Sequence, residues 1–256
     1  MNKKYYILIV ILIAYFLIIF LIFGLDNLKL EQRTATIFID KETAWSLEKN
    51  KWNKIEIDNE KISNQKFNVF INNENIGNFY LEKKENWILY DTSRNPYNYE
   101  LGNFFAIRAN YDVNVLNIKE QNISDINFIK KVLNDNGITE SEELTVASQY
   151  EFDIDNDGVK EVFYAVGNAF SRETSPSKVF SIVFMKKDKE MYYLHKEIEM
   201  NDGQNGCKPY INTVIDLDSD FKYEIIVSCG YYSIQNRSDK LYTFKNNEFQ
   251  LLASNE

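Results

Sequence analysis

Four carboxylates within one short segment are the residues of this chain best suited to chemistry. Asp153, Asp155 and Asp157 stand at alternate positions, Gly158 follows them, and Glu161 occupies the ninth position. Oxygen ligands that converge from one loop suit a hard cation, above all Ca²⁺. Glycine at the sixth position permits the sharp turn that folds such a loop around an ion. The segment therefore predicts a calcium-binding loop, and the alternative is a solvated, metal-free acidic turn.

The acidic segment occurs twice. Residues 153–161 recur 63 positions later as residues 216–224, and an apolar run precedes and follows each copy. The carboxylates of the second copy are Asp216, Asp218, Asp220 and Glu224. Phe221 stands there in place of the glycine and resists the positive φ that the turn often requires. The first copy is therefore the stronger prediction of a metal site, and the second is open between a metal site and an empty turn.

The twelfth loop position separates these segments from helix–loop–helix calcium sites. An EF-hand needs a bidentate glutamate there, whereas this chain has Tyr164 and Val227 inside apolar, strand-like runs. An ordinary EF-hand is thereby excluded, and a dockerin-like loop fails the same test. Both copies instead carry an acid at the ninth position and lie between two predicted strands.

This pattern, over about residues 145–256, resembles the FG-GAP/VCBS-type repeats of integrin-like β-propellers and bacterial surface proteins. The resemblance implies Ca²⁺ as the cofactor and partial or small β-propeller-like units of about four strands each. It implies these ligands in the first loop: Asp153, Asp155, Asp157, Glu161 and the backbone carbonyl of Val159. It implies these in the second: Asp216, Asp218, Asp220, Glu224 and the backbone carbonyl of Lys222.

The N-terminus predicts a membrane anchor. Tyr5–Leu25 contains no charged residue, and its 21 residues would form a helix of roughly 31 Å, enough to cross a bilayer. A cleaved signal is the alternative, but bulky residues stand where a signal peptidase needs small ones. Lys3 and Lys4 before the span place residues 1–4 in the cytoplasm. We therefore expect a single-pass membrane protein with an extracytoplasmic C-terminal domain.

The charge of the chain bears on its partners. Two of the 29 basic residues precede the apolar segment, which leaves 27 basic against 38 acidic residues, a net charge of −11. An acidic domain of this kind argues against nucleic acid as a partner, because phosphate binding needs a basic surface. The same charge is compatible with cation binding, or simply with a soluble, self-repelling surface.

The pattern of the remaining chain predicts a mainly β fold. A polar stalk over residues 26–36 precedes a β-rich region of unknown type over 37–120, which includes hairpins at 44–55 and 67–81. Nine glycines and three prolines are few for so many turns, so Asn and Asp are expected to take the turn positions. If the repeats belong to a four-bladed propeller, the Trp45–Ile55 hairpin is the segment expected to close it.

One amphipathic helix interrupts the β pattern over residues 124–137. Ser124 is the expected N-cap, and apolar residues recur at three- and four-residue spacing. These residues are Ile126, Ile129, Val132 and Leu133. We expect the helix to pack on the body of the domain; the alternative, a membrane-surface or partner-binding helix, lacks the usual basic face.

Other reactive residues are few. Cys207 and Cys229 could pair in an oxidising compartment, and the alternative is two free, buried thiols. The single histidine, His195, lies in a predicted outer strand, where a surface position is favoured over a role as general base. The motifs of serine hydrolases, zinc peptidases, phosphate-binding loops and Cys-x-x-Cys redox proteins are absent from the sequence.

These observations predict a membrane-anchored extracytoplasmic binding or scaffold protein with structural Ca²⁺ loops and no catalytic residues. Its partner would be a protein or a glycan, and an aromatic patch would draw on Trp45, Trp52 and Trp87. The first alternative is a cell-envelope hydrolase whose site lies within residues 37–145 and uses two close carboxylates. The second is an accessory subunit of a membrane signalling or secretion complex.

Overall fold

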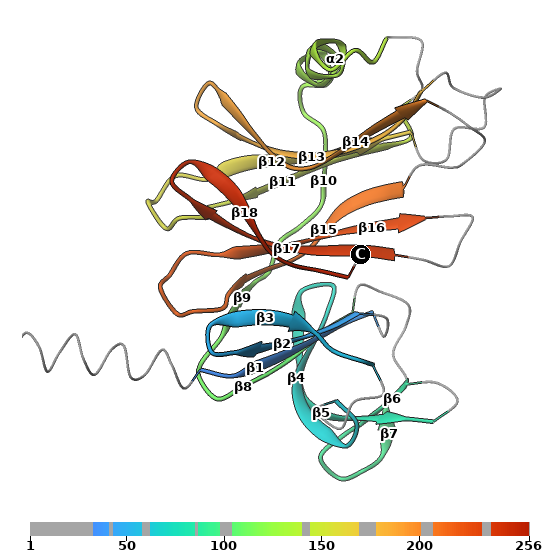
Figure 1. Ribbon diagram of the computed structural model, residues 1–256, viewed down its shortest axis with the longest axis vertical. Coiled ribbons are helices and arrows are strands. Elements are labelled where there is room, and N and C mark those ends of the chain that lie inside the picture. The colour runs from blue at the N-terminus through green and yellow to red at the C-terminus, as the bar shows by residue number, and fades with distance from the viewer. Residues whose placement is uncertain are drawn as a thin grey trace, which may run out of the picture.

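The computed structural model describes residues 33–40, 43–57, 62–84, 87–97, 104–139, 144–168, 178–200, 207–231 and 237–255. Within these ranges the chain forms three antiparallel sheets and one helix. The protein is therefore mainly β (Figure 1).

The first sheet, here called the N-terminal sheet, has eight strands. In spatial order they are β3 (Lys51–Lys54), β2 (Thr43–Glu48), β1 (Ala35–Ile39), β8 (Phe104–Ala109), β4 (Gln65–Ile71), β5 (Glu74–Lys83), β6 (Trp87–Tyr90) and β7 (Pro96–Tyr97). One face of this sheet curls around its own core. There Phe38 contacts Trp87 and Phe104, with ring centroids 4.9 and 5.9 Å away.

The other two sheets have five strands each. The middle sheet runs β18 (Glu248–Ser254), β17 (Arg237–Lys245), β16 (Glu224–Tyr231), β15 (Cys207–Asp216) and β9 (Asn114–Leu116). The helix-side sheet runs β10 (Gln121–Asn122), β11 (Val146–Phe152), β12 (Glu161–Gly167), β13 (Lys178–Lys187) and β14 (Glu190–Met200). The segment that follows the N-terminal sheet thus adds an edge strand to each of the other two, β9 and then β10.

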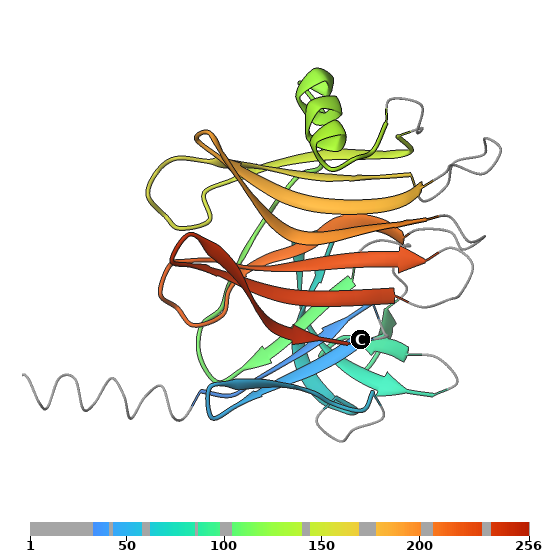
Figure 2. The same cartoon turned by 45° about the horizontal axis from the view of Figure 1, so that its top comes forward.

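The three sheets stack in layers, with the middle sheet buried on both faces (Figures 1 and 2). Val227 packs against Phe163 and other side chains of the helix-side sheet. Its neighbour Ile226 points the other way and packs against Ile37 and Trp45 of the N-terminal sheet. Successive residues of a strand face opposite sides, so an apolar pair such as Ile226 and Val227 indicates a strand buried on both faces.

Helix α2 (Ile126–Asp135) covers the outer face of the helix-side sheet. Ile129, Val132 and Leu133 are buried against it, while Ile126 is exposed. The predicted helix is thus present, but its N-cap is Asp125, whose carboxylate accepts a hydrogen bond from Phe128 N at 3.0 Å. Ser124 instead contacts Gln149 Oε1 through its hydroxyl and its backbone N–H.

The propeller-like arrangement predicted from the resemblance is wrong. No sheet formed by the described residues closes into a barrel or a propeller, and the layers are face-to-face stacks. The hairpin of Trp45–Ile55 closes no ring; it forms the β2–β3 end of the N-terminal sheet. Hairpins alone do not determine how sheets are arranged, because the same strands can form blades or layers.

The predicted membrane span, Tyr5–Leu25, lies outside the described residues. Among the residues that are described, no helix is both long and apolar enough to cross a membrane. The expectation of a transmembrane helix, and with it of a single-pass membrane protein with an extracytoplasmic domain, is corrected accordingly, because the part of the chain that the structure describes contains no spanning helix.

Candidate metal centre

The two acidic segments are matching loops between adjacent strands. The first loop (residues 153–161) joins β11 to β12, and the second loop (residues 216–224) joins β15 to β16. In the first, Ile154 N donates to Glu161 Oε2 at 3.1 Å; in the second, Leu217 N donates to Glu224 Oε2 at 2.9 Å. The ninth-position carboxylate therefore closes each loop onto its second residue.

The backbone follows the same path in both loops. The fourth and sixth positions have positive φ, at 58° for Asn156 and 87° for Gly158, and at 55° for Ser219 and 64° for Phe221. Phe221 thus adopts the left-handed conformation despite its side chain, which is exposed. The lack of a glycine in the second loop costs some conformational free energy but does not change the fold of the loop.

The aspartates arrange the loop backbone. Asp153 Oδ2 accepts from Gly158 N at 2.7 Å, and Asp216 Oδ2 accepts from Phe221 N at 3.2 Å. The fifth-position aspartates hold the two residues predicted to supply carbonyls: Asp157 Oδ1 accepts from Val159 N at 2.8 Å, and Asp220 Oδ1 from Lys222 N at 2.9 Å. The structure thus brings the predicted ligand residues into two compact loops.

A lysine enters the first loop. Lys187, the last residue of β13, places its Nζ 2.6 Å from Asp155 Oδ2, 2.9 Å from Glu161 Oε1 and 3.4 Å from Asp157 Oδ2. Burial lowers the pKa of Lys187, but the hydrogen bonds and charges of Asp155 and Glu161 outweigh it and raise the pKa overall. An ammonium group therefore offsets part of the negative charge of the first loop from within the protein. Sequence reasoning missed this role, although the Lys-rich turn that follows β13 was visible.

The second loop has no such lysine. Ligand oxygens of Asp216, Asp218 and Asp220 lie within 4.8 Å of one another. Arg33 donates a hydrogen bond from its guanidinium to the backbone O of Asp218, so one cationic group lies against this loop. Lys245, the last residue of β17, is exposed and acts on Asp218 through its charge. Among the described residues, no cationic side chain forms an ion pair with a carboxylate of this loop. Asp216 is only 4% exposed, and its Oδ1 is buried without a hydrogen-bond partner.

Burial raises the pKa of three carboxylates of the second loop, those of Glu224, Asp216 and Asp218. It raises the pKa of Glu224 to about 8, with a hydrogen bond from Leu217 N opposing the shift and the nearby charge of Asp218 adding to it. Burial also raises the pKa of Asp216 and of Asp218. Carboxylates that lie buried or half-buried close to one another behave in this way.

The two loops touch. Tyr223 N, in the second loop, donates to Ile154 O, in the first, at 2.9 Å. The side chain of Tyr223 in turn accepts from Asn114 Nδ2 at 3.0 Å. Burial raises the pKa of Tyr223, and the charges of Asp216 and Asp153 raise it further. A cation in the second loop would therefore act on a single acidic region that includes part of the first.

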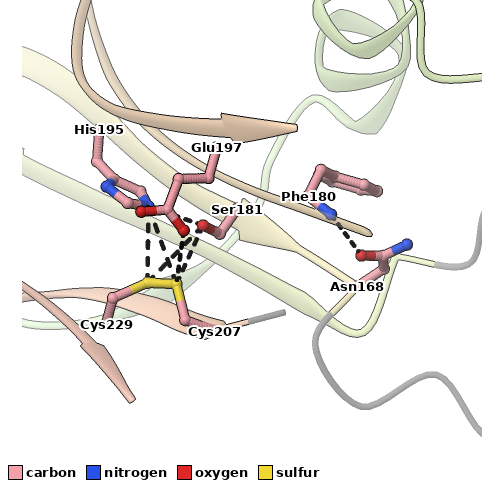
Figure 3. The surroundings of a disulfide bond; sticks show 7 residues. All are labelled: Asn168, Phe180, Ser181, His195, Glu197, Cys207 and Cys229. Atoms are coloured by element: carbon pink, nitrogen blue, oxygen red, sulfur yellow. Dashed lines mark hydrogen bonds and ion pairs between the residues drawn. A yellow bond between two sulfur atoms is a disulfide. The ribbon is translucent and has the colours of Figure 1, made fainter. Parts of the chain in front are cut away.

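The two cysteines form a disulfide, with their Cα atoms 5.3 Å apart. His195, expected on the surface, is buried beside them, with Nε2 2.7 Å from Ser181 Oγ (Figure 3). A β-bulge explains the error: Val183 pairs with His195 and Phe184 with Tyr193, so Leu194 has no partner in the ladder. A bulge reverses the alternation of faces, and it turns His195 inward.

The tryptophans expected to form an aromatic patch are mostly buried. Trp45 and Trp87 are buried and Trp52 is partly buried, so the three tryptophans make no exposed patch. A hollow of about 290 Å³ lies over β1, β2 and β8 in the N-terminal sheet. It is lined by Thr34, Ala35, Thr36, Ser46, Leu47, Glu48, Arg108, Ala109 and Asn110. Glu48 is its single carboxylate, so this hollow does not hold the carboxylate pair that a hydrolase would need.

With this geometry established, comparison with known proteins adds no relative: no family model, no curated protein and no solved structure matches the chain.

Proposed function

We propose that this chain is a binding or scaffold protein in which the second acidic loop, residues 216–224, holds a structural Ca²⁺ ion. The observation that carries the proposal is the buried Asp216 Oδ1, which has no hydrogen-bond partner and belongs to a cluster with Asp218 and Asp220. A buried oxygen of this kind costs free energy unless a hydrogen or a cation satisfies it.

The chemistry of the donor set selects the ion. Every side chain that converges here offers oxygen, and oxygen-only sets suit Ca²⁺ rather than a softer transition metal. Asp216, Asp218, Asp220 and Glu224 would bind through their carboxylates, and Lys222 through its backbone carbonyl. Leu217 N already fixes Glu224 Oε2, and the side chain of Thr243 also hydrogen-bonds this carboxylate, so an ion would share Glu224 with these two donors.

The role proposed for the ion is structural. The second loop joins β15 to β16, the two strands at the centre of the buried middle sheet, and Leu217 within it packs in the apolar cluster below. An ion that neutralises the loop would remove the repulsion between its carboxylates and hold the strand connection rigid. Through Tyr223 N and Ile154 O the effect would extend to the first loop.

The first loop also clusters ligand oxygens of Asp153, Asp155 and Glu161 and buries Asp155 Oδ1 without a hydrogen-bond partner, but there Lys187 supplies a positive charge. We therefore propose that Ca²⁺ binds the first loop only in competition with this ammonium group, and hence more weakly than the second. The proposed order of calcium affinity is the reverse of the one expected from Gly158. The competing charge of Lys187, a side chain from another strand, outweighs the advantage of a glycine in the turn.

Calcium titration of the full-length chain, stripped with a chelator, tests the proposal. We expect heat of binding and a rise in melting temperature with Ca²⁺, both removed by the paired substitutions Asp216→Asn and Asp218→Asn. The matched control carries Asp153→Asn and Asp155→Asn and should keep the calcium response. Absence of a response in the wild-type protein, or its persistence in the second-loop variant, overturns the proposal.

The partner is proposed to be a protein or a glycan, since the net charge of −9 disfavours nucleic acid. Glycan arrays and binding assays with candidate proteins, each with Ca²⁺ and with chelator, test this part. Calcium-dependent binding that the second-loop variant loses would support a scaffold role. Turnover of a glycan or peptide substrate by the purified chain would favour a hydrolase instead.

A further inference from the structure

A second cluster of ligating side chains lies between the middle and helix-side sheets, away from the acidic loops. Cys207 and Cys229 belong to β15 and β16, and His195 belongs to β14 across the interface. Ligand atoms of these three residues lie within 4.8 Å of one another, and all three residues are buried. We propose that, when the disulfide is reduced, Cys207, Cys229, His195 and Glu197 bind a Zn²⁺ ion.

The distances around His195 resemble those of a tetrahedral site. His195 Nε2 lies 3.9 Å from Cys207 Sγ, 3.6 Å from Cys229 Sγ and 3.8 Å from Glu197 Oε1. Glu197 Oε2 lies 4.0 Å from Cys207 Sγ. With Zn–S near 2.3 Å and Zn–N near 2.0 Å, the ligand atoms of a tetrahedron are separated by roughly 3.4–3.8 Å. Small side-chain rotations would therefore bring His195 and Glu197 into a tetrahedral arrangement. The two sulfurs would also have to move apart, which reduction of the disulfide permits.

The β-bulge at Leu194 makes the cluster. Without it, the alternation that points Tyr192 and Leu194 toward the middle sheet would point His195 away from the cysteines. With it, both His195 and Glu197 face the disulfide (Figure 3). Bulges that redirect side chains are typical of functional sites. Ser181, 2.7 Å from His195 Nε2 and 3.1 Å from Cys207 Sγ, would give up the imidazole and remain beside the sulfur.

The chemistry balances with a dithiol as the reductant. Two electrons and two protons pass from the dithiol to the Cys207–Cys229 bond, which breaks to give two thiols while the dithiol becomes a disulfide. Zn²⁺ then displaces both thiol protons, and its ligands are two thiolates, the neutral imidazole and the Glu197 carboxylate. Because the three donors other than Glu197 are buried, the site is closed in the manner of a structural zinc site.

The disulfide and the zinc site would stabilise different parts of the fold. The disulfide joins β15 to β16, which are neighbours within the middle sheet. The zinc site would also include β14, and would therefore tie the middle sheet to the helix-side sheet. The cluster lies near strand ends, since Cys207 is the first residue of β15 and Cys229 is close to the end of β16.

Cobalt substitution tests the site in the full-length chain. Under anaerobic conditions, protein reduced with a phosphine is titrated with Co²⁺ and then with Zn²⁺. We expect a thiolate-to-cobalt charge-transfer band and intense visible bands typical of tetrahedral cobalt, both removed by one equivalent of Zn²⁺. The acidic loops cannot produce the charge-transfer band because they contain no sulfur. Oxidised protein should show none of these bands.

Substitutions separate ligation from folding. His195→Gln should reduce Zn²⁺ affinity by at least the roughly 10–100-fold that loss of a supporting partner costs a metal site. Glu197→Gln, at a partly exposed position, should reduce it about 10-fold, while Glu199→Gln, at an exposed position two residues further along β14, should leave it unchanged. Circular dichroism verifies that each variant is folded.

Three outcomes overturn the proposal. One is a reduced wild-type protein that stays folded but gives no charge-transfer band. Another is a reduced protein that unfolds and is not refolded by Zn²⁺. The third is an unchanged Zn²⁺ affinity in both folded His195→Gln and Glu197→Gln variants, which would place the metal elsewhere.

Discussion

Lys187 Nζ lies 2.9 Å from Glu161 Oε1, so a side chain from β13 reaches into the loop that joins β11 to β12. The Glu161 side chain is only 1% exposed, whereas that of Lys187 is 23% exposed. The ammonium group thus supplies from within the protein the charge that a cation would otherwise bring. The second acidic loop has the same backbone and lacks this partner, which is the basis for distinguishing the two loops.

Lys187→Met should make the first loop dependent on calcium. Without the ammonium group, the buried Glu161 carboxylate and its neighbours repel one another, and the metal-free protein should lose about 2–3 kcal/mol of unfolding free energy. Added Ca²⁺ should restore most of this loss, as measured by urea unfolding with and without chelator. Lys189→Met, in the exposed turn after β13, is the control and should change stability by less than about 0.5 kcal/mol. Equal stability of the two variants would contradict the assigned role of Lys187.

The stability of the metal-free protein should fall as pH rises. The pKa of Glu224 is raised in the folded state from 4.5 to about 8, so the folded state binds more protons than the unfolded state between these values. The resulting stabilisation is fully present below about pH 4.5 and is lost as pH rises through about 8.

Urea midpoints between pH 5 and 8.5, in chelator, measure this effect. Glu224→Gln keeps an oxygen for Leu217 N but cannot ionise, so its stability should vary less with pH than that of the wild type. Ca²⁺ should also make the stability depend less on pH, because it favours the ionised carboxylates. A wild-type stability that rises over this range in chelator would refute the prediction.

A buried ionic network joins the N-terminal sheet to the middle sheet. Arg237 Nε donates to Asp239 Oδ1 at 2.7 Å, Arg237 also pairs with Asp40, and Thr43 Oγ1 donates to Asp239 Oδ2 at 2.6 Å. Arg237→Met should reduce the unfolding free energy by about 3–5 kcal/mol, because it leaves buried carboxylates without a counter-charge. Lys208→Met, at an exposed position on β15, is the control. Similar urea midpoints for both variants would show that the network contributes little.

The packing of helix α2 on the helix-side sheet should stabilise the protein through the buried Ile129 and not through the exposed Ile126. Ile129 is fully buried against the helix-side sheet, whereas Ile126, one turn earlier, is 44% exposed. Ile129→Ala should cost about 2–4 kcal/mol of unfolding free energy, and Ile126→Ala much less. Urea unfolding compares the two variants directly. If Ile126→Ala proved the more damaging change, the observed orientation of the helix would be wrong.

The hairpins were predictable because their turns are local. Asn72 and Asn73, between β4 and β5, both have positive φ, as do Asn246 and Asn247 between β17 and β18. Asparagine tolerates positive φ, the conformation that tight hairpin turns need. Asparagine pairs therefore indicate the turns even in a chain with few glycines. The acidic loops were predictable for the same reason: their turn and their carboxylates come from nine consecutive residues.

The orientation of His195 was not predictable, because it depends on one unpaired residue in the ladder. A strand that alternates regularly would have placed His195 outward, and no residue type marks Leu194 as a bulge. The role of Lys187 was hidden in a similar way. Its contact with Glu161 joins residues 26 positions apart that meet only when β12 and β13 pair.

By itself, the sequence indicated the hairpin strands, the turns between them and the loops that concentrate carboxylates, because each of these depends on neighbouring residues. Only the tertiary structure decided that the sheets stack as layers and that His195 meets the cysteines. It also decided that Lys187 pairs with the carboxylates of one acidic loop, while those of the other form no ion pair among the described residues. These outcomes depend on the pairing register and the packing of distant strands. The acidic loops therefore remained recognisable in the sequence, while the difference between them did not.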